Sequence, residues 1–315
     1  MLWSRDDMAD APAPVQSTNI ASPFGGSARL VQTLEVSTLI AKYRHKCGID
    51  VARWFNGLRD IHLYECTETG FRFWQPSSIA GDEDFYHLVG TAWKQYYRTD
   101  RWEYGIARDF VKKHRDVLEI GAGRGFFLKS LEAVTHHALG LELNGEAISS
   151  KVTKFPIEHA LLRDTVKRHP ESFDVVCAFQ VLEHIVDPSQ LLKDAIRCLR
   201  NDGLVILSTP SLDYPPFRRK EDAFDLPPHH VGHFNESVFR NIARNLKLEV
   251  VAIRKEPRRA VPYMDNTRAG ESIGRRCATT VVSSACNLLY RLRRAPGPNI
   301  LVVMRKSSQP SSALL

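Results

Sequence analysis

The sequence predicts an α/β protein built on a doubly wound, mostly parallel sheet of seven strands. Three observations lead to this fold class. Short apolar segments alternate with segments of helical periodicity from residue 116 to residue 209, the first apolar segment runs into a glycine-rich turn, and two more apolar segments follow near residues 250 and 302. Such alternation favours parallel strands joined by right-handed crossovers, which place helices on both faces of the sheet.

The chain before the predicted sheet divides into two parts. Residues 1–28 have an acidic start and Ala-Pro and Gly-Gly-Ser stretches, which are typical of a disordered tail and lack the basic, apolar pattern of a secretory signal peptide. Residues 29–85 are rich in aromatic side chains and are expected to form a lead-in, or cap, to a main domain of residues 86–306. Residues 307–315 are expected to be a second disordered tail.

The first predicted strand, residues 116–120, runs directly into the turn Gly121-Ala122-Gly123-Arg124-Gly125. Glycines let a backbone turn sharply and approach a ligand closely, because no Cβ stands in the way. The second predicted strand, residues 137–142, ends at Glu142, which places this carboxylate at the carboxyl edge of the sheet. Open α/β sheets bind ligands at that edge, where a carboxylate can accept both hydroxyls of a ribose. Together these features predict a nucleoside pocket.

Five further strands complete the predicted sheet. They are expected at residues 154–158, 174–179, 203–209, 248–253 and 300–304. A helix over Ser189–Arg200 separates two of them, because its apolar residues recur with the 3.6-residue period of one buried face. The last two strands are expected to pair as a terminal hairpin.

Two motifs carry a family resemblance. The run from Glu119 to Gly125, with Glu142, is similar to the first two motifs of the class I S-adenosylmethionine-dependent methyltransferases. Its glycines are spaced G-x-G-x-G, whereas dinucleotide-binding folds have G-x-G-x-x-G. The stretch from Asp174 to Pro188, which reads D-x-V-x-x-x-x-V-L-E-H-x-x-D-P, resembles the fourth-strand motif of the same family. The resemblance covers about residues 86–306 and implies the Rossmann-like methyltransferase fold.

The resemblance also implies a cofactor and a reaction. S-adenosylmethionine is the expected cofactor, with the first acidic residue near its amino-acid end and the second on its ribose. The expected cofactor-binding residues are Glu119, Gly121, Gly123, Glu142, Phe179 and Gln180. The expected reaction is methyl transfer to a small molecule, such as a sugar or glycoconjugate, because the lead-in resembles that of methyltransferases of sugar and surface-polysaccharide pathways. An NAD-dependent oxidoreductase or epimerase acting on a nucleotide sugar, and a non-catalytic cofactor-binding module, stay open as alternatives.

Three histidines are candidate bases for the acceptor. His184 follows the fourth strand beside Glu183, whose carboxylate is expected to raise the basicity of the imidazole. His229 and His230 follow two prolines in a loop expected to overhang the same sheet edge. The family motif at this loop reads much like P-P-H-H-x-x-x-F/W, and in several relatives one of its histidines serves the acceptor. Each histidine also has a structural interpretation, in which it only holds its loop to backbone carbonyls.

The cysteines and charges limit the remaining functions. Six cysteines are scattered without zinc spacing, and a reduced cytoplasmic protein is expected. A histidine-metal cluster is the alternative, with Asp225 as the nearest carboxylate, but the prolines after Asp225 argue against a helix that presents it beside His229, so no metal is predicted. Residues 254–297 form a basic insertion with ten basic and three acidic side chains, and an amphipathic helix is expected over Cys277–Leu292. This helix can contact an anionic membrane or a phosphate-bearing substrate, or pack on its own domain or a second subunit. No nucleic acid is expected, because an RNA-binding module is not recognisable, and the sequence leaves the oligomeric state open.

Overall fold

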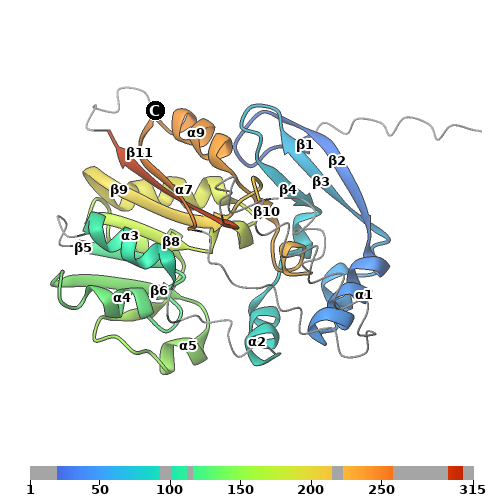
Figure 1. Ribbon diagram of the computed structural model, residues 1–315, viewed down its shortest axis with the longest axis horizontal. Helices are drawn as coiled ribbons and strands as arrows, with labels where there is room; N and C mark the ends of the chain where they lie inside the picture. Colours follow the sequence, from blue (N-terminus) through green and yellow to red (C-terminus); the bar gives the residue numbers. More distant parts are fainter. Residues whose placement is uncertain are drawn as a thin grey trace, which may run out of the picture.

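The computed structural model describes residues 20–92, 99, 101–111, 116–214, 223–257 and 297–307, and these residues form two sheets. Figure 1 shows the smaller sheet, in blue and cyan, beside the larger one, with β10 (Gly232–His233) and α9 (Glu236–Asn245) between them. Among the described residues, no helix has the length and apolar character needed to cross a membrane.

The larger sheet has the seven strands that the sequence predicts, in the order β11-β12-β9-β8-β5-β6-β7. Their bounds are β5 (Asp116–Ile120), β6 (His137–Glu142), β7 (Ile157–His159), β8 (Phe173–Phe179), β9 (Leu199–Pro210), β11 (Leu248–Lys255) and β12 (Asn299–Lys306). Neighbouring strands from β9 to β7 run parallel, and β12 pairs antiparallel with both β9 and β11. The predicted fold class and the terminal hairpin are therefore confirmed.

Helices cover both faces of this sheet because consecutive residues of a strand point to opposite sides. Val117 of β5 belongs to the core shared with α3 (Trp102–Val111) and α4 (Phe126–Leu131). Its neighbour Leu118 belongs to the opposite core, which includes residues of α6 (Leu162–Arg168), α7 (Pro188–Cys198) and α9. The short α5 (Gly145–Ser149) follows β6. Both faces are apolar, so the carboxyl edge is left for polar chemistry.

The smaller sheet was not predicted from the sequence. It is antiparallel, in the order β1-β2-β3-β4-β10. Its other strands are β1 (Ile20–Ala21), β2 (Ser27–Glu35), β3 (Asp60–Cys66) and β4 (Arg72–Gln75). The last strand, β10, belongs to the loop that carries His229 and His230, called the histidine loop below. In this strand Gly232 lies opposite Phe73 and His233 opposite Arg72. The lead-in therefore holds one end of that loop by backbone pairing.

Two predicted boundaries need correction. The tail expected over residues 1–28 already contains β1 and the start of β2, while residues 1–19 lie outside the described residues. The expected boundary between residues 85 and 86 falls inside α2 (Glu83–Ala92). Phe85 is fully buried in a core shared with α1 (Val36–Cys47), η1 (Ala52–Phe55) and η2 (Ser77–Ile79), so α2 packs with the lead-in.

The predicted basic insertion and C-terminal tail lie mostly outside the described residues. The structure describes residues 254–257 and 297 at the ends of the insertion, and residue 307 at the start of the tail. The expected helix over Cys277–Leu292 is not among the described residues, so it stays a prediction. The strands on either side of the insertion, β11 and β12, pair from Leu248 opposite Lys306 to Lys255 opposite Ile300, with one register shift between Val250 and Ala252.

Candidate functional site

A cavity of about 920 Å³ opens at the carboxyl edge of the large sheet. Pockets that enclose small-molecule ligands commonly measure about 300–1,000 Å³. Its walls come from the turn after β5, the end of β6, the residues after β8 and the loop before α9. All nine residues predicted for the site line it: Glu119, Gly121, Gly123, Glu142, Phe179, Gln180, His184, His229 and His230.

The glycine turn after β5 has a backbone that other residues rarely adopt. Gly121, Gly123 and Gly125 have φ values of 70°, 53° and 79°. A Cβ on Gly121 would also lie 2.5 Å from Cγ2 of Val181. The N–H of Gly121 donates to the carbonyl of Leu141 at 2.8 Å, which joins the turn to the end of β6. The glycines are therefore needed for the shape of the turn as well as for access to a ligand.

Glu142 holds three backbone N–H groups around this turn. Its Oε2 accepts from Gly123 at 2.7 Å, and its Oε1 accepts from Leu143 at 2.8 Å and Asn144 at 2.9 Å. A carboxylate offers about four lone-pair positions, so roughly one position on Oε2 remains for a ligand hydroxyl while these bonds last. Glu142 thus shapes the pocket in addition to facing it.

Glu119 is buried at the end of β5, with 2% of its surface exposed. Its Oε2 has no hydrogen-bond partner within the described part of the chain. Burial raises the pKa of this carboxyl well above its usual range; Arg101 opposes the rise and the charge of Glu142 adds to it. A buried acceptor without a donor is costly, so this position favours a ligand that brings a donor.

Phe179 and Gln180 lie where β8 ends. The ring of Phe179 packs edge-on against Phe127, with centroids 4.8 Å apart. Gln180 has a φ of 56°, which is uncommon for a residue other than glycine, and its Nε2 donates to Oε1 of Glu103 at 3.4 Å and to Oγ of Ser208 at 3.3 Å. Sequence reasoning missed Glu103, because a buried acid in α3 carries no motif that links it to β8.

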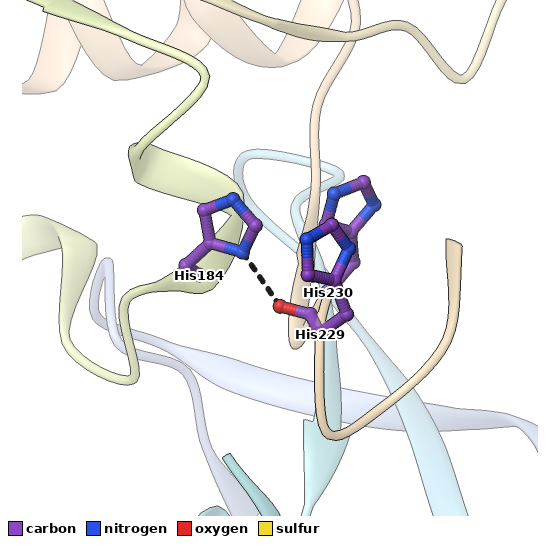
Figure 2. Close-up of side chains that lie close together, drawn as sticks. All are labelled: His184, His229 and His230. Atoms are coloured by element: carbon purple, nitrogen blue, oxygen red, sulfur yellow. Dashed lines mark hydrogen bonds between the residues drawn. The ribbon is translucent and has the colours of Figure 1, made fainter. Parts of the chain in front are cut away.

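The three histidines meet where η3 (Leu182–His184) lies against the loop before α9 (Figure 2). Nδ1 of His184 bonds to the carbonyl oxygen of His229 at 2.6 Å, and Nδ1 of His229 bonds to that of Phe224 at 2.8 Å. Nδ1 of His230 lies 3.3 Å from Oδ1 of Asp225, which belongs to η4 (Ala223–Asp225). A carbonyl oxygen only accepts, so in His184 and His229 the proton is on Nδ1 and Nε2 keeps its lone pair.

Burial keeps His184 and His229 uncharged. It lowers the pKa of His184 to about 3, and the neighbouring His230 contributes to the shift. The pKa of His229 is lowered for the same reasons, burial first. The expectation that Glu183 raises the basicity of His184 is therefore wrong: the pKa of His184 is lowered, chiefly because burial removes the hydration of its charged form. Burial raises the pKa of Glu183 itself to about 7, and His230 opposes this rise.

Two further polar groups face the cavity: Glu183, which sequence reasoning considered only as a neighbour of His184, and the hydroxyl of Tyr86. Glu183 is 1% exposed, and neither of its carboxylate oxygens has a hydrogen-bond partner among the described residues. The hydroxyl of Tyr86 is also buried without a partner in that part of the chain, and its ring lies edge-on to His184 at 5.5 Å. Nothing in the local sequence signals missing partners, because they depend on packing between distant segments.

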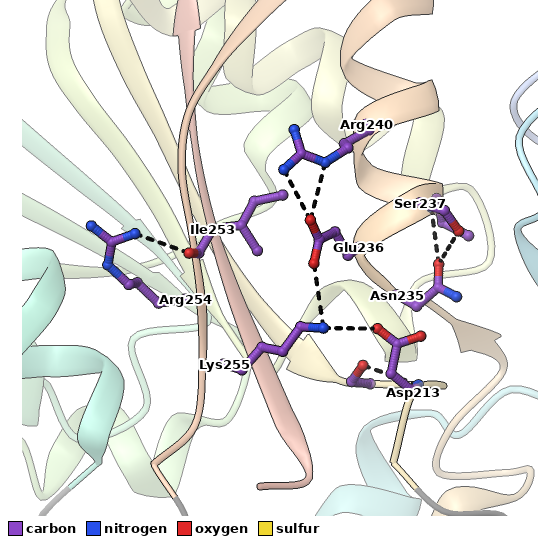
Figure 3. A network of polar contacts seen from close by, with 10 residues as sticks. Asp213, Asn235, Glu236, Ser237, Arg240, Ile253, Arg254 and Lys255 are labelled. Atoms are coloured by element: carbon purple, nitrogen blue, oxygen red, sulfur yellow. Dashed lines mark hydrogen bonds and ion pairs between the residues drawn. The ribbon is translucent and has the colours of Figure 1, made fainter. Parts of the chain in front are cut away.

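An ion-pair network fixes the far end of the histidine loop (Figure 3). Nζ of Lys255, at the end of β11, lies 3.3 Å from Oε2 of Glu236 and 3.5 Å from Oδ2 of Asp213. Arg240, one turn along α9, donates to the other oxygen of Glu236 at 2.9 Å. Asn235 caps α9 by accepting the N–H of Val238 at 2.9 Å. β10 and the start of α9 thus both hold the loop on the C-terminal side of His229 and His230.

A family model described as a methyltransferase domain matches residues 95–253, just over half of the chain. A probable S-adenosylmethionine-dependent methyltransferase of Mycolicibacterium smegmatis is 29% identical over 140 residues, which cover 43% of this chain and 52% of that protein. A ubiquinone biosynthesis O-methyltransferase of Proteus mirabilis is 30% identical over 104 residues, covering 30% of this chain and 42% of that protein. The chain thus spans about half the length of these curated relatives.

Solved structures of low identity also resemble the chain. A S-adenosylmethionine-dependent methyltransferase from Archaeoglobus fulgidus has a TM-score of 0.49 and 19% identity, covering 71% of this chain and all of that one. A putative methyltransferase from Bacillus halodurans has a TM-score of 0.48 and 13% identity, covering 66% of this chain and all of that one.

Proposed function

The chain belongs to the class I S-adenosylmethionine-dependent methyltransferases, and we propose that it transfers a methyl group from this cofactor to a small-molecule acceptor in the cavity. The sulfonium of S-adenosylmethionine supplies an electrophilic methyl group, so the protein has to bind, align the acceptor and exclude water. One observation carries the proposal: the glycine turn and the histidine cluster line the same cavity. A cofactor site and a site for an acceptor therefore lie within reach of each other.

The residues at the glycine turn fit the cofactor. The Oε2 of Glu119 has no donor within the described structure, and the α-ammonium group of S-adenosylmethionine would supply one. The remaining lone pair on Oε2 of Glu142 would accept a ribose hydroxyl. Gly121 and Gly123 leave room for the ligand to approach the backbone. Phe179 and Gln180 lie beside this part of the cavity and would flank the ligand.

The histidine cluster would receive the acceptor. His184 and His229 keep a lone pair on Nε2, because their Nδ1 atoms donate to carbonyl oxygens. Such a nitrogen can accept a hydrogen bond from a hydroxyl or amine and so orient the acceptor. The lowered pKa values of His184 and His229 make both imidazoles weak bases, so either would take the proton only as the new bond to the methyl carbon forms. His230 lies beside them and is held by Asp225. A histidine base, as the sequence predicted, is our proposal for this step.

Two acceptor classes have support. The lead-in resembles that of sugar and polysaccharide methyltransferases, and the relatives include proteins named ubiquinone biosynthesis O-methyltransferases. We propose a hydroxyl-bearing acceptor, with a sugar or glycoconjugate first and a phenol second. The test measures S-adenosylhomocysteine formed from S-adenosylmethionine with panels of each class. Turnover with one panel supports the reaction, and cofactor binding without turnover on either panel would favour the non-catalytic module.

A test of the histidine base uses His184→Ala and His229→Ala with any acceptor that turns over. Both variants should lose at least tenfold in kcat while the KM for S-adenosylmethionine stays within twofold, because they lie at the acceptor end of the cavity. His137→Ala, at an exposed position of β6, is the matched control. Unchanged kcat in both variants would leave the histidines a purely structural role.

A further inference from the structure

Three imidazoles converge on one point of the cavity wall. The rings of His184, His229 and His230 lie with centroids 4.4–5.0 Å apart, and each offers a ring nitrogen within 4.8 Å of the other two. Figure 2 shows His184 on one segment facing the His229–His230 pair on the other. A metal that binds nitrogens at about 2.1 Å in a tetrahedral arrangement holds them about 3.4 Å apart. The three imidazoles would therefore have to move about 1 Å toward one another to bind the metal together.

The hydrogen bonds around these rings have the pattern found behind metal ligands. Histidines that bind a metal usually donate their other ring N–H to a carbonyl or carboxylate, which fixes the tautomer and the direction of the lone pair. Here the Nδ1 acceptors are the carbonyl oxygens of His229 and Phe224 and the carboxylate of Asp225. His233, in the same loop, differs because its Nε2 accepts from Nε1 of Trp74 at 3.2 Å. The lone pair of Nε2 in His233 is therefore taken by a hydrogen bond.

A second observation points to a cation at this place. Glu183, the residue before His184, lines the cavity with 1% of its surface exposed, and both its carboxylate oxygens lack a hydrogen-bond partner in the described part of the protein. The hydroxyl of Tyr86 lacks one there as well. A buried carboxyl without a hydrogen-bond partner is unfavourable, and a metal ion on the neighbouring imidazoles would compensate its charge. The hydroxyl of Tyr86 needs a hydrogen-bond partner, which a ligand of the metal could supply.

We propose that His184, His229 and His230 form a site for a divalent transition metal, with an open position toward the cavity. Imidazole donors suit zinc, cobalt, nickel or iron, whereas magnesium and calcium prefer oxygen ligands. Three protein ligands and one open position are typical of a metal that binds substrate. The inference rests on the proposed function only in placing the acceptor here. A bound metal would polarise the acceptor oxygen and lower the pKa of its hydroxyl. The imidazoles would then act as metal ligands, and the histidine base proposed above would apply only to the metal-free protein.

The test is metal binding to the full chain, purified without a tag and treated with chelator. Isothermal titration with zinc chloride should show one equivalent bound, and cobalt chloride should give the visible absorption of a low-coordinate cobalt site. Magnesium chloride should show no binding. His184→Ala and His230→Gln should each weaken zinc binding at least tenfold. Asp225→Asn should weaken it about tenfold, because it removes the carboxylate behind His230.

Controls separate this inference from the proposed function. His137→Ala should bind zinc as the wild type does, and each variant should still bind S-adenosylmethionine, which shows that it is folded. Absence of stoichiometric zinc and cobalt binding in the wild type, with S-adenosylmethionine still bound, would overturn the metal site and leave the methyltransferase proposal in place. Zinc binding that is undiminished in His184→Ala and His230→Gln would also overturn it. Zinc binding without cofactor binding would instead contradict the proposed function alone.

Discussion

Glu142→Ala tests whether one carboxylate both shapes the glycine turn and binds the cofactor. The substitution removes hydrogen bonds from the N–H groups of Gly123, Leu143 and Asn144. At about 1 kcal/mol each for a partly exposed carboxylate, their loss should lower the free energy of unfolding by about 3 kcal/mol. Loss of the ribose contact should weaken S-adenosylmethionine binding at least tenfold, or about 1.4 kcal/mol.

Urea unfolding and isothermal titration measure these two effects separately. Glu142→Gln should lie between wild type and Glu142→Ala, because its amide oxygen can keep two of the three backbone bonds while its NH₂ group cannot accept the third. Glu146→Ala, at an exposed position of α5, is the control and should change neither quantity by much. If Glu142→Ala loses stability but binds S-adenosylmethionine within twofold of wild type, the carboxylate only supports the turn and the ribose contact is refuted.

Three further predictions follow from buried or crowded groups. Glu119→Gln should stabilise the cofactor-free protein by about 1–2 kcal/mol at pH 7 yet weaken S-adenosylmethionine binding. In the wild type the pKa of Glu119 is raised in the folded state, so the stability that the protonated acid provides is present below about pH 4.5 and is lost as the pH rises. The midpoint of thermal unfolding should therefore be higher in Glu119→Gln than in the wild type at pH 7, and this difference should vanish near pH 4. Gly121→Ala should lower the free energy of unfolding by about 1–3 kcal/mol, because the φ of this residue is 70° and the new Cβ meets Val181. In urea unfolding, the double variant Gly121→Ala with Val181→Ala should recover part of this loss. Tyr86→Phe should keep or raise the thermal midpoint, since it removes a buried hydroxyl without a partner in the described structure, and should raise the KM for the acceptor; an unchanged KM would place Tyr86 outside the acceptor site.

The large sheet could be predicted because its strands are buried on both faces and therefore appear as short apolar runs. The smaller sheet could not, for reasons visible in two strands. Most of β2 is exposed, including Leu30 and Val31 at 40% each, so it lacks a buried stripe. The two-residue strand β10 is too short to be recognised, and it pairs with β4 more than 150 residues earlier in the chain.

The site shows the same division between local and distant signals. The glycine turn and Glu142 follow directly from the ends of neighbouring strands, so their meeting was predictable. The sequence also indicated that His184 and the histidine loop share a sheet edge. The lowered pKa values of His184 and His229, the unpartnered oxygens of Glu183 within the described structure, and the contact of Gln180 with Glu103 depend on burial by distant segments. None of these could be derived from local patterns.

Isothermal titration of the purified wild-type chain with S-adenosylmethionine, S-adenosylhomocysteine and NAD⁺ in parallel tests the cofactor assignment most directly. One equivalent of each sulfur nucleoside should bind with micromolar affinity, and NAD⁺ should not bind. Binding of NAD⁺ alone would contradict the assignment in favour of an oxidoreductase, and no binding of any of the three would contradict the assignment of the cavity as a cofactor site.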